Sequence, residues 1–189
     1  MKTLTAPFFG WAIVLTLAGT VSVQADTFER NKAWTSVGSA GILTRPDLDK
    51  VRFDGPSLTF AAGQTGQVTV RYNVVAVDGL FAGIGDRMGF RLDLNYLDAV
   101  QWGSNVSARL LDVDINGAGS HQLLTFNSEN YPQVSRFQRQ SVSTCMDYNF
   151  DFGERAIYLE VTIGRSTGTP GAPNPILRGL QVAPVACVD

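Results

Sequence analysis

The amino-acid sequence predicts an all-β protein, an antiparallel two-sheet sandwich of about nine or ten short strands. Three observations lead to this fold class. Apolar residues recur at every second position in several segments, which is the period of a half-buried strand. Glycine-rich turns separate these segments, and residues 26–189 contain no apolar spacing typical of an amphipathic helix. The pattern favours a jelly-roll-like or Ig-like sandwich, and a closed barrel is the alternative.

The N-terminal residues 1–25 have the three parts of a secretory signal peptide. Lys2 supplies a basic start, residues 8–17 (FFGWAIVLTL) form an apolar run, and residues 23–25 (VQA) place small side chains before a cleavage point. The apolar run is short for a membrane span of about 20 residues, which favours cleavage over an uncleaved anchor. We therefore expect residues 26–189 to form one sandwich domain that is secreted or periplasmic and not attached to a membrane.

Short strands are predicted first along this domain. Residues 33–42 mix single large apolar residues with small ones and are long enough for one short strand. Residues 45–47 (RPD) follow as a turn. Residues 51–53 and 57–60 form two further strands, because the Asp-Gly-Pro between them is a strong turn sequence.

The clearest strand is residues 67–77 (QVTVRYNVVAV). Val68, Val70 and Tyr72 point to one face, and the polar residues between them point to the other. Its β-branched and aromatic residues suit a packed sheet surface, so we predict that this strand lies at the centre of a sheet. The glycine-rich residues 80–89 then cross from one sheet to the other. The later predicted strands are residues 90–96, 106–115, 121–126, 137–142, 148–152, 157–163 and 176–182.

Residues 106–115 and 121–126 are predicted to form a hairpin with Asn116 and Gly117 at its tip, because Asn-Gly readily adopts the positive φ angles of such turns. The apolar phase slips within the first arm, which indicates a β-bulge near Leu110.

The two cysteines, Cys145 and Cys187, are predicted to form one disulfide. An even number of cysteines in an exported chain favours such a bond. A metal site built on two free thiols would need His or Cys partners, and the sequence offers none at a suitable spacing.

The charge of the chain limits its partners. The sequence has 15 Lys and Arg residues against 17 Asp and Glu residues, a formal net charge of −2, with no basic cluster. This balance argues against nucleic acid and anionic membranes as partners. A polysaccharide or a cell-envelope protein remains as the expected partner.

Asp112, Asp114 and Asn116 match the opening D-x-D-x-N-G of a calcium-binding loop. The twelfth position of such a loop should be Glu, and here it is Leu123. On a strand, the two aspartates would simply project together from the solvent face of the hairpin. Calcium is therefore a weak hypothesis, and we expect no cofactor.

Catalytic groups are hard to find in this chain. The only histidine, His121, follows Ser120, and neighbours on a strand point to opposite faces, so the serine would not be activated. A glycosidase needs only two carboxylates, but no spacing rule selects a pair. Glu160 is expected on the outer face of a strand as a solubilising residue. The carboxylate candidates are Glu129, Asp151, Glu154 and Glu160.

Aromatic residues near turns are the remaining candidates for ligand binding. Trp34, Trp102 and Tyr131 could stack on a sugar ring, although large aromatic side chains mostly pack in or around the core. We therefore expect an exported, non-catalytic binding or structural module at the cell surface, associated with carbohydrate. The alternatives are a glycan-hydrolysing enzyme with paired carboxylates and an assembly protein that pairs through a sheet edge.

Overall fold

The computed structural model describes residues 33–75, 88–98, 103–117, 119–146, 154–166, 174–185 and 187. These residues form eleven strands and three short 3-10 helices, η1 (Gly38–Ala40), η2 (Arg45–Lys50) and η3 (Ser128–Asn130). None of the helices in these ranges has the length and apolar character of a membrane span. The predicted signal peptide lies outside the described residues and stays a prediction.

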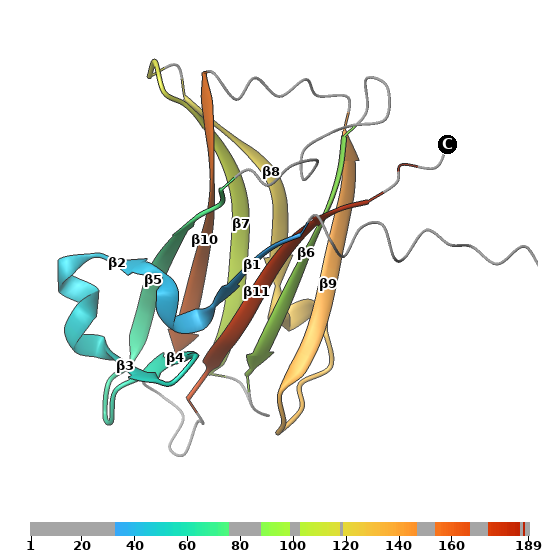
Figure 1. Ribbon diagram of the computed structural model, residues 1–189. Coiled ribbons are helices and arrows are strands. Elements are labelled where there is room, and N and C mark those ends of the chain that lie inside the picture. Colours follow the sequence, from blue (N-terminus) through green and yellow to red (C-terminus); the bar gives the residue numbers. More distant parts are fainter. Residues whose placement is uncertain are drawn as a thin grey trace, which may run out of the picture.

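Two antiparallel sheets face each other, which confirms the predicted all-β sandwich (Figure 1). The six-stranded sheet has the order β3 (Val51–Asp54), β4 (Ser57–Phe60), β11 (Ile176–Pro184), β6 (Met88–Leu97) and β9 (Gln138–Met146), and β1 (Trp34–Val37) also pairs with β11. The five-stranded sheet has the order β2 (Ile42–Leu43), β5 (Gly66–Asn73), β10 (Arg155–Arg165), β7 (Ser104–Asp114) and β8 (Ser120–Asn127).

The core lies between the two sheets and is built from the apolar phase of each strand. In the five-stranded sheet, Val70 pairs with Val161, which pairs in turn with Ala108, so three inward side chains form a row across the strands. The six-stranded sheet contributes the inward residues of β6 and β11. Fully buried side chains from the two sheets include Leu58, Phe60, Phe90, Leu92, Leu94, Tyr96, Leu110, Leu159, Ile163 and Leu177.

The strand β5 does not lie at the centre of its sheet, so that prediction was wrong. Its outer neighbour β2 pairs through only two residues, whereas β10 has long neighbours on both sides. Alternation of apolar and polar residues reports which face of a strand is buried. It does not report how many strands flank it, and β10 has the same alternation as β5.

The hairpin of β7 and β8 and its bulge are confirmed, but the extra residue lies on β8. Leu110 pairs with Leu124 and Leu111 with Gln122, so Leu123 is the additional residue. The pairing of β7 with β10 runs without a shift from Asp114 to Ser104. The inward phase of β7 therefore continues past Leu110 to Asp112.

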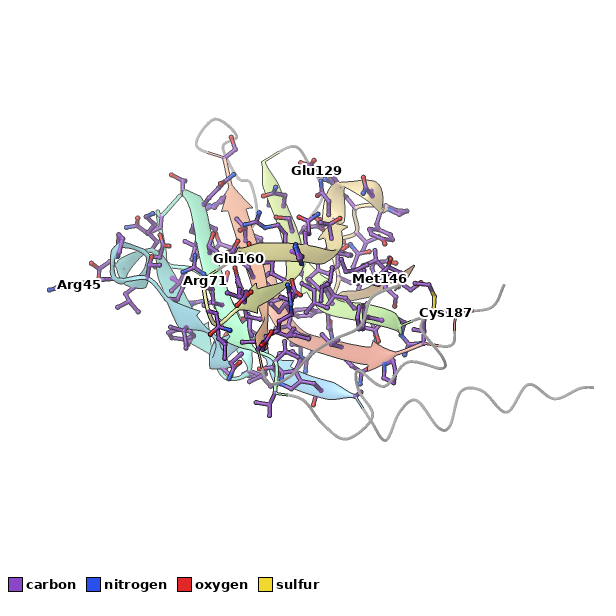
Figure 2. The ribbon with its side chains drawn as sticks, turned by 90° about the horizontal axis from the view of Figure 1, so that it is seen from above. Arg45, Arg71, Glu129, Met146, Glu160 and Cys187 are labelled. Carbon is purple, nitrogen blue, oxygen red and sulfur yellow. A yellow bond between two sulfur atoms is a disulfide. The ribbon has the colours of Figure 1, made fainter. Side chains whose placement is uncertain are left out.

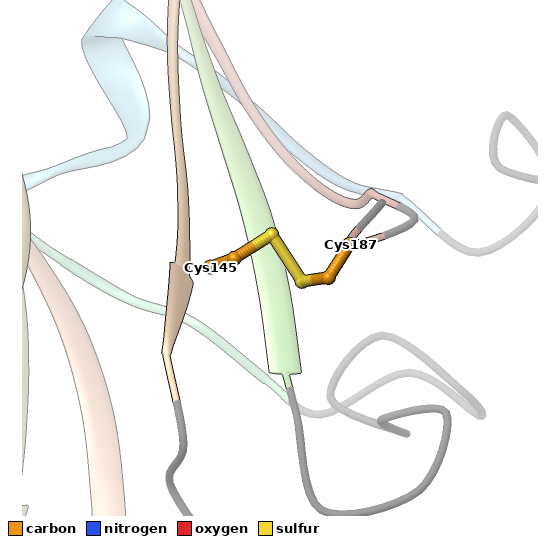
Figure 3. The surroundings of a disulfide bond; sticks show 2 residues. All are labelled: Cys145 and Cys187. Atoms are coloured by element: carbon orange, nitrogen blue, oxygen red, sulfur yellow. A yellow bond between two sulfur atoms is a disulfide. The ribbon is translucent and has the colours of Figure 1, made fainter. Parts of the chain in front are cut away.

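The disulfide between Cys145 and Cys187 is confirmed, with a Cα–Cα distance of 5.8 Å. It joins β9 to the C-terminal tail across β6 (Figure 3). Gly89 of β6 pairs with Cys145, and a Cβ atom at Gly89 would lie 2.9 Å from the Cys187 sulfur and 2.5 Å from the Val185 carbonyl oxygen. The close approach of the tail therefore needs glycine at this position. Cys145 lies within the continuous strand β9, and the predicted strand 148–152 lies outside the described residues.

Candidate functional site

An open hollow of about 380 Å³ lies on the outer face of the five-stranded sheet, at the end of strands β5, β10 and β7. We call it the Gly164 hollow. Its lining includes Gln67, Asn105, Glu129, Gly164, Arg165 and Ser166.

Strand register places a glycine at the floor of this hollow. Gly164 on β10 pairs with Gln67 on one side and with Asn105 on the other, so the three residues share the outer face. Because glycine has no side chain, the space above Gly164 is available to the side chain of a neighbouring residue. A Cβ atom at Gly164 would lie only 2.0 Å from Asn105 Oδ1, which shows that the Asn105 amide lies over the glycine.

The helix η3 brings a carboxylate to the same hollow. Ser128 is fully buried, and its hydroxyl accepts a hydrogen bond from the Val106 amide at 2.9 Å, which fixes η3 against β7. Asn127 caps the helix, since its Oδ1 accepts from the Glu129 amide at 3.1 Å. Glu129 is therefore held at the rim of the hollow by a buried anchor and a cap.

The rim on the β10 side is held by hydrogen bonds to two loops. Arg165 Nη1 donates to the Gln64 carbonyl oxygen at 3.0 Å. The Ser166 amide donates to the Gly103 carbonyl oxygen at 2.5 Å. The end of β10 is thus tied to the segments that precede β5 and β7.

Three polar side chains in the hollow have little to bind within the protein. Among the described residues, the side-chain amides of Gln67 and Asn105 have no hydrogen-bond partner. The Glu129 carboxylate accepts one long hydrogen bond, from Asn127 Nδ2 at 3.4 Å. The two amides can donate and accept, and the carboxylate can accept, so the hollow offers both kinds of group to a ligand.

A second polar group, outside the hollow, occupies the centre of the same face. Glu160 lies between two arginines: Arg71 Nε is 3.0 Å from one carboxylate oxygen, and Arg109 Nη2 donates to the other. Figure 2 shows Arg71 and Glu160 together on the sheet. Burial alone would raise the pKa of Glu160, but the two arginines outweigh it and hold the pKa below its usual value.

Glu160 lies on the outer face of its strand, as the alternation predicts, but it is 8% exposed and does not solubilise the sheet. The other carboxylates predicted as candidates are separated from it. Glu129 lies apart from Glu160 in Figure 2, Glu154 precedes β10, and Asp151 is outside the described residues. Among the described members of this set, only Glu129 lines the Gly164 hollow.

The predicted aromatic residues lie away from the hollow or outside the described ranges. Trp34 on β1 and Tyr131 are half-buried and pack against the core. Tyr131 stacks on Phe126, with ring centroids 5.3 Å apart, and its hydroxyl donates to the Ser141 carbonyl oxygen at 3.0 Å. Trp102 is not among the described residues, so its role in sugar stacking stays a prediction.

The residues of the proposed calcium loop have other partners. Asp112 is fully buried and not on the solvent face, which corrects the expectation, because the β7–β10 register keeps it on the inward phase. Its carboxylate accepts from Arg155 Nη1 at 2.5 Å and from the His121 amide at 2.9 Å. Asp114 Oδ1 accepts from the Asn116 amide at 2.7 Å. Within the described ranges, no three His, Cys, Asp or Glu side chains gather as a metal site.

Asp98 is a buried acid that the sequence analysis missed. It follows β6 and is fully buried, and Gln138 Nε2 donates to its Oδ1 at 3.1 Å. Its Oδ2 and the hydroxyl of the nearby Tyr96 have no hydrogen-bond partner among the described residues. Burial raises the pKa of the Asp98 carboxyl, more than its hydrogen bonds lower it. No signal in the sequence distinguishes this aspartate from the turn residues around it.

Comparison with known proteins finds only weak structural likenesses. No protein-family model and no curated protein matches the chain. A solved xylan-binding module is 12% identical over 84% of this chain and 94% of its own, with a TM-score of 0.40. A family two carbohydrate esterase from Cellvibrio japonicus is 13% identical over 82% of this chain, with a TM-score of 0.41. A protein of infectious bursal disease virus, Gx strain, is 13% identical over 82% of this chain, also with a TM-score of 0.41.

The matched part spans only 36% of the esterase chain and 32% of the virus chain. Identities and TM-scores this low assign no function, and the function has to be argued from the site itself.

Proposed function

We propose that this protein binds carbohydrate in the Gly164 hollow and catalyses no reaction on it. The observation that carries the proposal is the convergence of Gln67, Asn105 and Glu129 on a glycine-floored hollow, where their polar groups are nearly free of partners. Each sugar hydroxyl both donates and accepts hydrogen bonds. Two amides and a carboxylate therefore match adjacent hydroxyls on one ring.

The charges in the hollow favour a neutral ligand. Glu129 and Arg165 are its only charged lining residues among those described, and they have opposite signs. A neutral, hydroxyl-rich segment is therefore preferred over a strongly charged one. Fixed strands and an anchored helix hold the backbone of these residues in place before the ligand arrives, so binding has to order only their side chains.

The environment of the acidic residues supports binding rather than glycan hydrolysis. A general acid must hold a proton near the operating pH, but the lowered pKa of Glu160 keeps it ionised. Both of its oxygens are also occupied by arginines. Asp98, whose pKa Glu129 helps to raise, is fully buried and does not line the hollow, so no second carboxylate stands beside Glu129 among its described lining residues.

We also propose that the protein acts outside the cytosol. The disulfide suits an oxidising compartment, so a secreted or periplasmic protein would meet polysaccharides of the cell envelope.

Assembly through an edge strand has less support, because the Tyr131 hydroxyl already binds a carbonyl oxygen of the edge strand β9.

A glycan-array screen of the purified protein, followed by calorimetry on the best ligand, tests the proposal. Asn105→Ala removes one side-chain amide, and Gly164→Ala displaces it, since the new Cβ would lie 2.0 Å from Asn105 Oδ1. We expect each variant to weaken binding about tenfold or more, which corresponds to about 1.4 kcal/mol. Gln122→Ala, an exposed change on β8 of the same sheet, is the matched control and should bind like the parent.

A blank array would contradict the proposal. So would a glycan that binds both hollow variants as tightly as the parent while circular dichroism shows all of them folded. The screen is run with calcium and with a chelator, and we expect the same ligands in both. Loss of binding in the chelator would contradict a metal-independent site in the Gly164 hollow.

A further inference from the structure

A row of three charged residues crosses the centre of the outer face that also carries the Gly164 hollow. Arg71 of β5 and Arg109 of β7 flank Glu160 of β10, because Glu160 pairs with both in the strand register. Arg71 Nε donates to one carboxylate oxygen at 3.0 Å, and Arg109 Nη2 donates to the other. Both oxygens of the only acid in this row are therefore occupied.

The row carries one surplus positive charge. The side chains of Arg71 and Arg109 are 55% and 54% exposed, and Glu160 is the only acidic partner of either among the described residues. The helix η2, which packs beside β5, carries two basic and two acidic residues and adds no net charge. Two arginines against one carboxylate leave a positive charge that faces the solvent.

The free donors of Arg71 have the geometry that a carboxylate needs. A guanidinium can hold a carboxylate with two parallel N–H groups on either of two edges, Nε with Nη2 or Nη1 with Nη2. Within the protein Arg71 donates only through Nε, so its Nη1–Nη2 edge has no partner among the described residues. The bond to Glu160 also restricts the guanidinium before a ligand binds, which reduces the cost of ordering it.

Two other exposed arginines have no edge that is free of contacts. Arg109 donates through Nη2, which belongs to both edges. On the outer face of the six-stranded sheet, a smaller hollow of about 220 Å³ contains Arg139, whose Nη2 donates to Asp93 and to Gln181. Of these three arginines, Arg71 is the one placed to hold a carboxylate, and Arg109 adds charge beside it.

The groups around Arg71 suit a sugar. Asn73 pairs with Tyr158, two residues along from Arg71 and Glu160 and on the same outer face. Asn73 is exposed, and its side-chain amide has no hydrogen-bond partner among the described residues, so it can bind hydroxyl groups. In the other direction along β10, Gly164 lies four residues from Glu160, roughly 13 Å at the rise of a β-strand. One extended glycan can therefore reach both sites.

We propose that the Nη1–Nη2 edge of Arg71 binds the carboxylate of an acidic sugar, in the same glycan that places a neutral sugar in the Gly164 hollow. The ligand class is then a polysaccharide with acidic residues spaced among neutral ones. The choice of a polysaccharide rests on the proposed function, whereas the carboxylate contact at Arg71 does not. An acidic protein segment offers the same carboxylate, and the test separates it from a sugar.

NMR of the arginine side chains in the full chain tests the carboxylate contact, with glucuronate as the probe and its methyl ester as the neutral counterpart. We expect glucuronate to shift the guanidinium signals of Arg71, and the ester to need at least a tenfold higher concentration. This measurement on the parent does not depend on the folding of any variant.

Arg71→Lys keeps the charge but loses the two parallel N–H groups, so calorimetry should show glucuronate binding at least tenfold weaker. Arg52→Lys, at an exposed arginine of β3 in the other sheet, is the matched control and should bind like the parent. N-acetylglutamate methylamide, which carries one carboxylate and no sugar ring, should bind more weakly than glucuronate.

A hyaluronan octasaccharide, in which glucuronate alternates with a neutral sugar, tests the link to the Gly164 hollow. We expect it to bind at least tenfold more tightly than glucuronate, and Asn105→Ala to remove most of that gain. An octasaccharide that binds through Arg71 but no tighter than glucuronate would contradict the Gly164 hollow and support the acid site.

Four results would overturn the inference at Arg71. They are no binding of glucuronate, equal binding of its methyl ester, an Arg71→Lys protein that binds like the parent, and equal binding of the glutamate derivative.

Discussion

At the scale of single residues, buried carboxylates in this protein differ in their partners. Glu160 has an arginine on each oxygen, and its pKa is lowered. Asp98 has no cationic partner among the described residues, one of its oxygens has no hydrogen bond there, and its pKa is raised. Burial acts in the same direction on both, so the partners decide the sign.

Asp98→Asn should stabilise the protein at pH 7. The folded-state pKa of Asp98 lies above its unfolded value of about 3.9, so the folded state binds the proton more tightly. Stability therefore falls as pH rises from about 4 through the folded-state pKa. Asparagine can still accept from Gln138 and carries no charge. Urea unfolding at pH 7 and pH 4 should show a gain in the free energy of unfolding that shrinks at pH 4.

Glu160→Gln is the comparison for that experiment, because its pH dependence should have the opposite sign. The folded-state pKa of Glu160 lies below its unfolded value of about 4.3. Its stabilisation is present above that value and is lost as pH falls through the folded-state pKa. The variant should therefore be less stable than the parent at pH 7 and closer to it in acid. An Asp98→Asn protein that loses stability at pH 7 would contradict the interpretation.

At the scale of the strand, the alternation of inward and outward positions decides whether a substituted side chain is buried or exposed. Val70 on β5 is fully buried between Leu43 and Val161, while Asn73 on the same strand is exposed. An aspartate at position 70 would be a buried, unpaired charge, whereas an aspartate at position 73 would lie in water.

Val70→Asp should prevent folding, because a buried, unpartnered carboxylate costs several kcal/mol, comparable with the whole stability of a domain. Near-ultraviolet circular dichroism should show no fixed tertiary structure. Asn73→Asp introduces the same charge on the opposite face and should melt within a few degrees of the parent. A Val70→Asp protein that melts like the parent would mean that the inward face of β5 is assigned wrongly.

At the scale of the whole molecule, the disulfide ties the C-terminal tail to β9 over a separation of 42 residues. In the chain-entropy description, closing a loop of that size removes about 4 kcal/mol of freedom from the unfolded chain. The tail also packs over Gly89, and the Val185 amide donates a hydrogen bond to the Gly89 carbonyl oxygen at 3.1 Å.

Replacing both cysteines with serine should lower the free energy of unfolding by about 4 kcal/mol, through the unfolded state. Guanidinium unfolding of the variant measures this loss. The parent protein in a reducing agent is the matched control and should unfold at the same midpoint as the double variant. A midpoint equal to that of the oxidised parent would show that the disulfide contributes nothing to stability.

Strand faces, the β7–β8 hairpin and the disulfide were predictable because each depends on local pattern or on cysteine count. The Gly164 hollow was not, although the sequence marks each part. Gly164 reads as the start of a loop, Gln67 lies on the polar face of its predicted strand, and Asn105 precedes the predicted strand 106–115. They become one site only because β10 pairs with β5 and β7 in a particular register.

Asp112 shows the same limit from the other side. The sequence places it on the solvent face of the hairpin strand 106–115, but the unshifted register with β10 turns its side chain inward, where Arg155 donates to it. The extra residue in the pairing of β7 with β8 is Leu123, which lies on β8. The apolar phase of one strand shows that the pairing is irregular, but it does not show which of the two strands carries the extra residue.

The sequence by itself determined the fold class, the inward phase of β5, β6 and β10, and the pairing of two cysteines. Alternation is a property of each strand alone, and two cysteines allow only one intramolecular bond. Only the tertiary structure decided which strands are neighbours, which carboxylates meet arginines, and where hollows lie on the two outer faces. Those outcomes depend on hydrogen-bonded register between strands far apart in the chain, which no local pattern specifies.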